Sequence, residues 1–386
     1  MTARRRVLFY VQHLLGIGHI KRSALICRSL AEAGLETILV SGGLPLSGLD
    51  LGGARLEQLP PLRSADLDFT ALLDEAGQPV DEAWKAARRD RLLALFRNLR
   101  PDALIIEMYP FGRRQMRFEL IPLLEAARAA VPRPLVLSSL RDILAKAPRP
   151  DRAAWIAEQI ARDFDGVLVH ADPGFVTLEA SFPEAAGFAE KLFYTGFVAP
   201  PAPQPAPGPR AGVVVSAGGG AVGEALIETA LAARPRSRLA GEDWTVLTGP
   251  NFPERRLAAL AGQNPETVTL ARAHPQFLAL LSRAKLSISQ GGYNTVMDLL
   301  RVGTPAVIVP FAAEGEAEQT MRARLLEAAG AAVMLAEDDL GPASLAQAIE
   351  RATAAESSPQ RLDFDLEGAA GSASRVLQAL NERARA

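Results

Sequence analysis

The chain has 386 residues, of which 48% are hydrophobic and 22% charged, a balance typical of a well-cored globular protein of two or three domains. Its formal net charge of −2 and pI near 6.2 argue against nucleic acid as the main partner. The single cysteine, Cys27, excludes an intramolecular disulfide and a cysteine-based zinc cluster, and fits a reducing cytoplasm.

The first apolar run, residues 7–11, follows Arg4, Arg5 and Arg6 and so imitates the start of a signal peptide. It lacks a small-residue cleavage site and runs directly into a glycine turn, so we expect a buried strand. No segment reaches the ~18 to 20 uninterrupted apolar residues that span a bilayer. We therefore expect a soluble, cytoplasmic protein and leave open a peripheral contact with the inner face of the membrane.

Short apolar runs alternate with longer segments of helical period, which is the pattern of a parallel sheet with crossover helices. In the first half, the expected strands are residues 7–11, 37–40, 103–106, 135–138, 167–170 and 192–195. In the second half, they are residues 212–216, 245–247, 268–270, 286–289, 306–309 and 332–335. Residues 60–79 show no clear periodicity and are a candidate acceptor loop.

A proline-rich segment, residues 199–210, separates the two series of strands. Its prolines remove backbone donors and stiffen the chain, which excludes a helix or a central strand. The sequence therefore predicts an α/β fold with two doubly wound, Rossmann-like domains, residues 1–198 and 211–370, that face a central cleft. We expect a last helix, residues 371–386, and leave open whether it packs on the first domain.

A glycine turn after the run 286–289 predicts an anion site. Gly291 and Gly292 let one backbone approach another, and the helix that follows begins with free N–H groups. Asp298 comes about one helical turn after Asn294 and can share its face, where a carboxylate could bind a ribose diol. A phosphate site beside a ribose site indicates a nucleotide.

Each half also has a glycine-rich turn after its first strand, where open parallel sheets bind their ligands. The turn of the first half contains Gly16, Gly18, His19, Lys21 and Arg22. Because Lys21 replaces the third glycine of a dinucleotide fingerprint, an oxidoreductase is disfavoured. The turn of the second half contains Ser216, Gly218, Gly219 and Gly220.

With these turns the chain resembles the GT-B glycosyltransferases, in particular the family 28 type that moves GlcNAc from UDP to a lipid-linked acceptor in peptidoglycan synthesis. The resemblance is strongest over about residues 284–335 and thinner at the two glycine turns. It implies the GT-B fold and a nucleotide-sugar donor, with UDP as the preferred nucleotide. Asp298 stands where the ribose-binding residue is usually Glu, and Glu318 with Gln319 stands where a Gln pair usually reaches the sugar. These departures leave the identity of the sugar open.

The resemblance gives a set of donor-binding candidates in the second half of the chain. They are Ser216, Gly218, Gly219, Gly220, Arg272, Gln290, Gly291, Gly292, Asn294, Thr295, Asp298, Glu318 and Gln319. No cofactor is implied. Because no Asp-x-Asp marks a metal-held diphosphate and the His and Asp residues do not form a recognisable metal-ligand spacing, we predict that activity is independent of metal ions.

His19 is the main catalytic candidate, because displacement at an anomeric carbon with inversion requires a base for the acceptor's proton. It follows a glycine turn at a helix start, where the helix dipole would lower its pKa and favour the neutral imidazole. The alternative is a histidine that caps the helix or donates to a neighbouring carbonyl. Asp142, after the run 135–138, is a reserve base or a partner that orients a histidine; an ion pair with Arg141 or a helix cap is the alternative.

On the acceptor side, Lys21 and Arg22 could neutralise a phosphate or could form a solvated helix face. Arg113 and Arg114 lie in a segment of aromatic residues and arginines that could hold an acceptor's phosphate or touch an anionic membrane surface, with a solvated helix face as the alternative. Together with Gly16 and Gly18 in the first glycine turn, these residues form the acceptor-side set. The acceptor itself is unknown and could be lipid-linked.

Three functions remain open. The leading hypothesis is an inverting, metal-independent glycosyltransferase with a nucleotide-sugar donor. The turn 16–22 also resembles the loop of the UDP-sugar hydrolase of pseudaminic acid biosynthesis, in which the histidine activates water, but the long segment 43–118 is more than a water substrate needs. A nucleotide-sugar-binding protein without chemistry is the third hypothesis.

Overall fold

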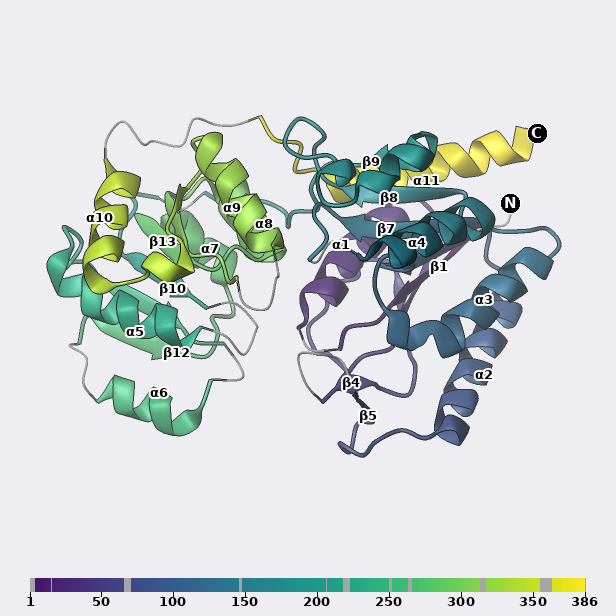
Figure 1. Ribbon diagram of the computed structural model, residues 1–386, viewed down its shortest axis with the longest axis horizontal. Coiled ribbons are helices and arrows are strands. Elements are labelled where there is room, and N and C mark those ends of the chain that lie inside the picture. The colour runs from purple at the N-terminus through teal and green to yellow at the C-terminus, as the bar shows by residue number, and fades with distance from the viewer. Residues whose placement is uncertain are drawn as a thin grey trace. The chain divides into compact units, whose positions relative to one another are not determined.

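The computed structural model describes residues 4–14, 16–65, 71–145, 148–205, 207–217, 223–249, 252–262, 266–312, 317–354 and 363–385. The chain divides into two compact units, which are best followed by the colour bar of Figure 1. Unit 1 comprises Met1–Ala199 with Phe364–Ala386, and unit 2 comprises Pro200–Asp363. The chain thus leaves unit 1 where the proline-rich segment begins and returns to it at Phe364, before the boundary expected at residue 370.

Unit 1 is built on a seven-stranded sheet, among the residues described, in which neighbouring strands are parallel. The order across the sheet is β3-β2-β1-β6-β7-β8-β9. The strands are β1 (Arg6–Val11), β2 (Glu36–Ser41), β3 (Arg55–Gln58), β6 (Ala103–Glu107), β7 (Leu135–Arg141), β8 (Gly166–His170) and β9 (Leu192–Tyr194). The inner strands are apolar and buried along their length because helices cover both faces of a parallel sheet.

The helices of unit 1 connect these strands and carry the residues of the candidate site. They are α1 (Gly18–Glu32), α2 (Glu82–Leu99), α3 (Arg117–Ala129), α4 (Pro150–Asp163) and α11 (Gly368–Arg385), with the short 3-10 helices η1 (Arg114–Met116), η2 (Leu178–Ala180) and η3 (Pro183–Lys191).

Unit 2 has a second parallel sheet, with the order β12-β11-β10-β13-β14-β15. Its strands are β10 (Val213–Ser216), β11 (Trp244–Leu247), β12 (Val268–Ala271), β13 (Leu286–Ser289), β14 (Ala306–Ile308) and β15 (Val333–Met334). Its helices are α5 (Glu224–Ala233), α6 (Glu254–Ala261), α7 (Phe277–Arg283), α8 (Tyr293–Val302), α9 (Glu318–Ala328) and α10 (Pro342–Thr353), with η4 (Arg234–Arg236) and η6 (Glu337–Asp339). Trp244 is fully buried in the core of this unit.

The predicted α/β class with two parallel-sheet, Rossmann-like domains is confirmed. Every expected strand is present, with ends within one residue of those expected except in β7, which continues to Arg141. The sequence did not indicate β3, an edge strand. It also did not indicate the short antiparallel pair β4 (Arg63–Ser64) and β5 (Leu72–Leu73), which lies in the segment expected to be an irregular acceptor loop.

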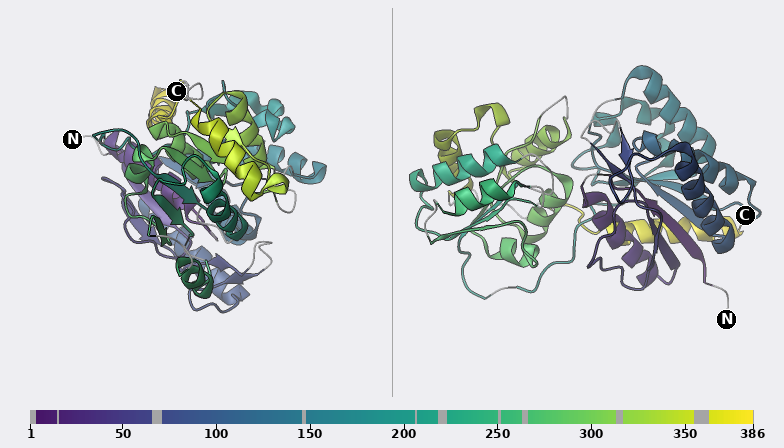
Figure 2. Two further views of the ribbon diagram at one scale, coloured as in Figure 1. Left: turned by 90° about the vertical axis from the view of Figure 1, so that its left-hand side faces the viewer. Right: turned by 90° about the horizontal axis from the view of Figure 1, so that it is seen from below.

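The last helix, α11, belongs to unit 1 although unit 2 separates it from the rest of that unit in the sequence. It packs against α1, as both views in Figure 2 agree. Its apolar face, which includes Val376 and Leu380, joins the core that also contains Ile26, Leu30 and Leu35.

Strand order reverses beside the first strand in both sheets. In unit 1 the chain moves outward from β1 to β2 and β3, then returns to place β6 on the other side of β1. In unit 2 the equivalent reversal lies between β10 and β13. Loops diverge at such a switch point, so ligands bind there, beyond the carboxyl ends of the strands. The glycine turns found in the sequence follow β1, β10 and β13, and thus all adjoin switch points.

Candidate active site

The switch point of unit 1 brings together two residues that lie far apart in the sequence. His19 is in the first turn of α1, which follows β1, and Glu107 is the last residue of β6. Because β1 and β6 are adjacent and parallel, with Tyr10 opposite Ile106, their carboxyl ends meet at one edge of the sheet. His19 Nδ1 lies 2.6 Å from Glu107 Oε1.

The Glu107 carboxylate is fully buried and is surrounded by positive groups. The same Oε1 accepts a hydrogen bond from Arg22 Nη2 at 2.6 Å, and Arg113 Nη2 lies 3.8 Å from Oε2. Burial acts to raise the pKa of Glu107, but His19, Arg113 and Arg22 together lower it to about 2. Glu107 is therefore ionised at neutral pH and serves as a hydrogen-bond acceptor.

The His19 imidazole is neutral at physiological pH. Burial, followed by the charges of Arg113 and Arg22, outweighs the opposing effect of Glu107 and lowers the pKa of His19 to about 3. The sequence suggested the helix dipole as the cause, whereas burial is the largest one. Since Glu107 only accepts, Nδ1 carries the proton and Nε2 holds the free lone pair.

In the His19–Glu107 pair, the Nε2 atom of His19 is the one that could accept a proton. The His19 side chain is 22% exposed, and Nε2 has no hydrogen-bond partner among the residues that the structure describes. A neutral imidazole held at Nδ1 by a carboxylate, with Nε2 open, is the arrangement of a general base and the group that orients it.

The structure separates the other candidates of the first glycine turn. Lys21 is exposed, as a solvated helix face requires, whereas Arg22 is buried and bound to Glu107. No described atom lies within 4 Å of the position that a Cβ on Gly16 would occupy. Gly18 is the first residue of α1. At Gly16 and Gly18 the turn therefore has no side chain that would cover its backbone next to His19.

Asp142 was expected as a reserve base or as a partner that orients a histidine; the residue in contact with His19 Nδ1 is Glu107, and the role of Asp142 stays a prediction. The Asp142 side chain is fully buried, and its Oδ1 accepts a hydrogen bond from Ile143 N at 2.8 Å. Sequence reasoning missed Glu107. The available signal was an acidic residue that ends an apolar strand, but only the strand order places it beside His19.

Of the two arginines expected on the acceptor side, Arg114 is exposed and Arg113 is half-buried with its guanidinium beside Glu107. Phe111, two residues before Arg113, accepts a hydrogen bond from Arg152 Nη2 at 3.0 Å through its backbone oxygen. The segment is thus attached to α4, and only Arg113 is directed at the candidate base.

A second buried charge cluster supports the loops behind the site. Arg88, on α2, is fully buried and donates to Glu119 Oε2 at 2.8 Å, to Gly42 O at 2.9 Å and to Gln12 Oε1 at 2.7 Å. Tyr10 OH donates to the same Glu119 carboxylate. Gln12 lies just after β1, so this cluster fixes the path of the chain as it enters the glycine turn.

In unit 2, the Gly291-Gly292 turn connects β13 to α8. Gly292 is the N-cap of α8 and has an ordinary extended backbone (φ −63°), and α8 has no side-chain cap. A Cβ on Gly292 would meet no described atom within 4 Å. Neither backbone conformation nor packing against the described residues requires glycine here, and a glycine at the N-terminus of α8 is compatible with an anion site.

At Gly291, in contrast, packing against neighbouring residues favours glycine. A Cβ there would lie 3.2 Å from Gln319 O and 3.3 Å from Ile308 Cγ2, which is tighter than ordinary contact. The carbonyl of Gly291 accepts a hydrogen bond from Arg322 Nη1 at 2.7 Å. The turn is therefore fixed from behind by α9 while its other side stays open.

Arg322 is a residue that the sequence analysis did not single out. It is fully buried, stands over the Tyr293 ring, and lies 3.5 Å from Glu318 Oε1. Its signal in the sequence is the spacing of four residues between Glu318 and Arg322 on one helix, a common ion-pair spacing.

The structure places the residues expected to reach the donor sugar close to this support. Glu318 is buried against Arg322, and Gln319 Oε1 accepts a hydrogen bond from Phe311 N at 3.2 Å. In this state both side chains stabilise the turns that follow β13 and β14. A role toward the sugar stays a prediction.

The remaining donor candidates are distributed around the same edge of the sheet. Asn294, Thr295 and Asp298 are half-buried on α8, with Asn294 and Asp298 four residues apart and hence on one face. Ser216 is buried at the end of β10, and Gln290 is half-buried. Gly218, Gly219 and Gly220 lie outside the described residues.

Arg272, expected near the nucleotide base, follows β12. Its Nη1 donates to Phe252 O at 2.7 Å, and its Nη2 forms an ion pair with Glu254. The side chain thus joins the β12 loop to the start of α6.

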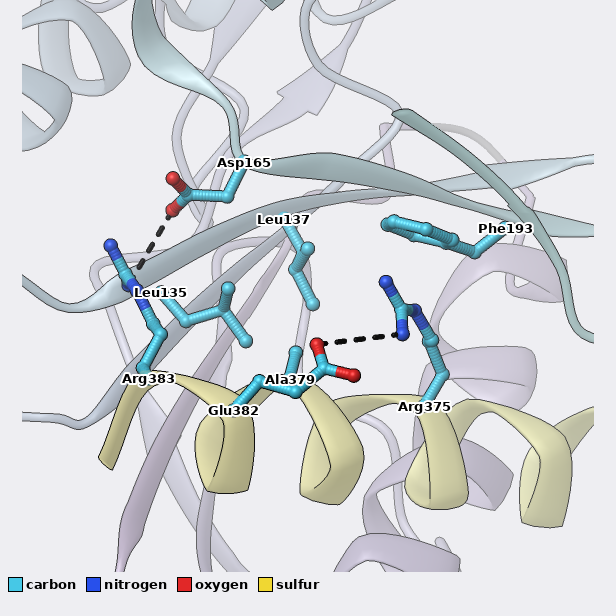
Figure 3. A pocket seen from close by; sticks show the side chains of 8 residues that line it. All are labelled: Leu135, Leu137, Asp165, Phe193, Arg375, Ala379, Glu382 and Arg383. Carbon is cyan, nitrogen blue, oxygen red and sulfur yellow. Dashed lines mark ion pairs between the residues drawn. The ribbon is translucent and has the colours of Figure 1, made fainter. Parts of the chain in front are cut away.

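A pocket of about 330 Å³ lies elsewhere in unit 1, between α11 and the sheet (Figure 3). It is lined by Leu135, Leu137, Asp165, Phe193, Arg375, Ala379, Glu382 and Arg383. Leu135 begins β7 and Asp165 precedes β8, so the pocket lies at the amino ends of the strands, away from the switch point. Arg375 pairs with Glu382 along α11 and lies over the Phe193 ring, and Arg383 pairs with Asp165, so the packing of this helix accounts for the charged residues of the pocket.

The described residues contain neither a metal-binding cluster nor a membrane-spanning helix. Within the described ranges, no group of three or more His, Cys, Asp or Glu side chains is placed to hold a metal ion. No helix in the same ranges combines the length and the hydropathy needed to cross a membrane.

Comparison with known proteins finds similarity to glycosyltransferases, in part of the chain by sequence and over most of it by fold. Residues 213–372 match the glycosyltransferase family 28 C-terminal domain. A UDP-N-acetylglucosamine--N-acetylmuramyl-(pentapeptide) pyrophosphoryl-undecaprenol N-acetylglucosamine transferase of Synechococcus elongatus is 32% identical over 132 residues, 34% of this chain and 36% of the relative. The match thus spans about a third of the length of that relative.

Two other similarities extend over most of the chain. An uncharacterized glycosyltransferase of Methanosarcina mazei is 22% identical over 339 residues, 83% of each chain. The crystal structure of CalG4, the calicheamicin glycosyltransferase, is similar with a TM-score of 0.63 at 18% identity, covering 99% of this chain and 98% of that one. The chain therefore carries a glycosyltransferase family 28 C-terminal domain and has the GT-B fold of glycosyltransferases.

Proposed function

We propose that the protein is an inverting glycosyltransferase that takes a sugar from a nucleotide donor, with UDP preferred, and transfers it to an acceptor hydroxyl. The observation that carries this proposal is the His19–Glu107 pair at the switch point of unit 1, where a neutral imidazole presents Nε2. The family 28 domain in unit 2, with an open helix N-terminus at Gly292, supports a diphosphate-linked donor.

In the proposed reaction, Nε2 of His19 takes the proton of the acceptor hydroxyl as its oxygen attacks the anomeric carbon. The bond from that carbon to the diphosphate oxygen breaks on the opposite face, and the nucleoside diphosphate leaves. As the proton arrives, the Nδ1–H bond to Glu107 becomes an ion pair, which stabilises the new imidazolium. The N–H groups at the start of α8 would stabilise the charge on the departing diphosphate.

The remaining donor contacts belong to the same proposal. Asp298 would bind the ribose, and Glu318 with Gln319 would reach the sugar after a change in their present contacts. The curated relative from Synechococcus elongatus is named as acting on a UDP sugar, which supports UDP here.

The function is tested with a panel of UDP-, TDP- and GDP-sugars, with and without candidate acceptor hydroxyl compounds, by mass spectrometry of the nucleotide and sugar products. We expect UDP release that depends on an acceptor and that falls ~100-fold or more in His19→Ala, because the base is lost. Glu32→Ala, at the exposed end of the same helix, is the matched control. Equal release of UDP and free sugar in water alone would identify a hydrolase, and binding without turnover would identify a non-catalytic protein.

Glu107→Gln tests the orienting role of the carboxylate. An amide can turn its donor toward Nδ1 and favour the wrong tautomer, so we expect kcat to fall by ~10²- to 10⁴-fold. The KM for the donor should change little, because Glu107 lies in unit 1. Circular dichroism and thermal unfolding check that the variant is folded. A kcat within a factor of about two of the wild type would show that the tautomer does not depend on Glu107.

The pH dependence of kcat/KM tests the state of His19. A base must be neutral, and the pKa of His19 is lowered to about 3, so activity should be lost only as the pH falls through that region. We expect no acidic limb near pH 6.5, where an ordinary histidine titrates. Initial rates between pH 4.5 and 8 at subsaturating donor give the profile. A limb at about pH 6 to 7 that disappears in His19→Ala would contradict this description of the site.

Arg322→Met tests the support of the donor turn. The substitution keeps much of the volume but leaves Gly291 O without its donor and Glu318 without its counter-charge, so we expect the Kd for UDP to rise ~10-fold or more. Arg322→Lys, which keeps the charge, should recover part of the affinity. Arg324→Met, on the exposed face of the same helix, is the control. Isothermal titration of all variants would contradict this role if Arg322→Met bound UDP like the wild type.

A further inference from the structure

Arg113 has a feature that the proposed reaction does not use. It has a left-handed backbone conformation, with φ of 58°, which residues other than glycine adopt rarely and at an energetic cost. It precedes the short helix η1 and follows the loop that leaves β6 at Glu107. This conformation holds its guanidinium toward the candidate base, so the strain is located at the proposed active site.

The Arg113 guanidinium also has donors without a hydrogen-bond acceptor. Its side chain is 11% exposed, and its Nε and Nη2 atoms are buried without a hydrogen-bond partner. The nearest acceptor, Glu107 Oε2, lies 3.8 Å from Nη2, which is beyond hydrogen-bonding distance. Buried donors of a folded protein are normally paired, so two unpaired donors on one arginine require an explanation.

The charges around Arg113 indicate which class of ligand would pair with its two unpaired donors. Burial is the main cause that lowers its pKa, and the neighbouring positive charges of Arg141 and Arg22 lower it further. Arg22 is already bound to Glu107 Oε1 at 2.6 Å. Arg22 therefore occupies one oxygen of that carboxylate, and the buried, unpaired Nε and Nη2 donors of Arg113 favour an additional anion at this position.

The position also points to the source of the anion. Arg113 and His19 face the two oxygens of the same carboxylate, Oε2 and Oε1. An anion on Arg113 would therefore lie close to the hydroxyl that His19 deprotonates. That hydroxyl belongs to the acceptor in the proposed reaction.

We propose that Arg113, with Arg141 beside it, binds a phosphate-class anionic group of the acceptor next to the reacting hydroxyl. A guanidinium fork with two free N–H groups matches the oxygens of a phosphate. The inference rests on the proposed glycosyltransferase function for the identity of the reacting hydroxyl. It distinguishes Arg113 from the exposed Arg114, which was grouped with it in the sequence analysis.

The test uses the full chain, with inorganic pyrophosphate as the probe in isothermal titration. UDP is titrated first, and pyrophosphate is then added at saturating UDP, so that the donor site is occupied. We expect the wild type to bind pyrophosphate under these conditions and Arg113→Gly to bind it ~10-fold or more weakly. Arg113→Lys should be intermediate, and Arg97→Gln, which removes an exposed guanidinium from α2, should bind like the wild type.

Thermal unfolding separates a ligand-binding role from a structural one. Glycine accepts the left-handed conformation without strain and removes the unpaired donors, so Arg113→Gly should have a Tm equal to or higher than that of the wild type. A lower Tm with unchanged pyrophosphate affinity would overturn the proposal in favour of a structural arginine.

The other outcomes are equally decisive. Absence of pyrophosphate binding to the wild type, or equal affinity in Arg113→Gly, would refute the anion site. Pyrophosphate binding that is lost when UDP is present would assign the anion to the donor's diphosphate and refute an acceptor site. Failure of UDP to bind at all would contradict the proposed function, and this result is obtained separately from the pyrophosphate titration.

Discussion

The parallel pairing of β1 with β6 is the interaction on which the candidate site depends. It makes two strands that are far apart in the sequence end at the same edge of the sheet, with Tyr10 opposite Ile106. The residue that ends β6 and the helix that follows β1 must then meet, which gives the 2.6 Å contact between Glu107 and His19. Helix α1 itself is held by α11, which returns from the end of the chain to cover it. The order of the strands therefore determines the position of the His19 imidazole. The glycine turn only leaves space next to it.

Unit 2 repeats the same strand order but uses its switch point differently. There the candidate features are the N-terminus of α8, where the N-cap residue Gly292 makes no side-chain cap, and the position of Gly292 itself, where a Cβ would meet no described atom. Arg322 and Gly291 form the fixed side of that turn, and Gly292 forms the open side. In the proposed function, one unit would supply the proton acceptor and the other the anion-binding backbone. Transfer from a phosphate-activated donor needs both a proton acceptor and an anion-binding group. The two units would therefore have complementary roles in the proposed reaction.

The sequence predicted what depends on local signals and missed what depends on strand order. The strands, the glycine turns and the boundary at the prolines follow from periodicity and composition within short windows. Glu107 could not be found in this way, because its role arises from β6 lying beside β1. Asp142 was favoured instead, since it also follows an apolar run, but its carboxylate is buried against the next backbone N–H. Arg22 and Lys21 are adjacent in the sequence and indistinguishable by type, yet only Arg22 faces the core. Glu318 likewise contacts Arg322 one turn further along α9; the four-residue spacing is compatible with this ion pair, but the burial of both side chains is seen only in the structure.

The electrostatics of Glu107 link the base to the proposed acceptor anion. A base in a buried site must remain neutral before reaction and yet be able to hold a proton during it. Arg22 and Arg113 lower the pKa of His19, and Glu107 raises it. An anion bound at Arg113 would neutralise one of the two opposing positive charges, so the basicity of His19 would rise when the acceptor binds. The base would then be weakest in the empty site, where water is the only proton donor, and strongest beside the correct substrate. Such coupling would favour transfer over hydrolysis without any additional residue, because the candidate base and the arginine proposed to bind the acceptor lie against the same carboxylate.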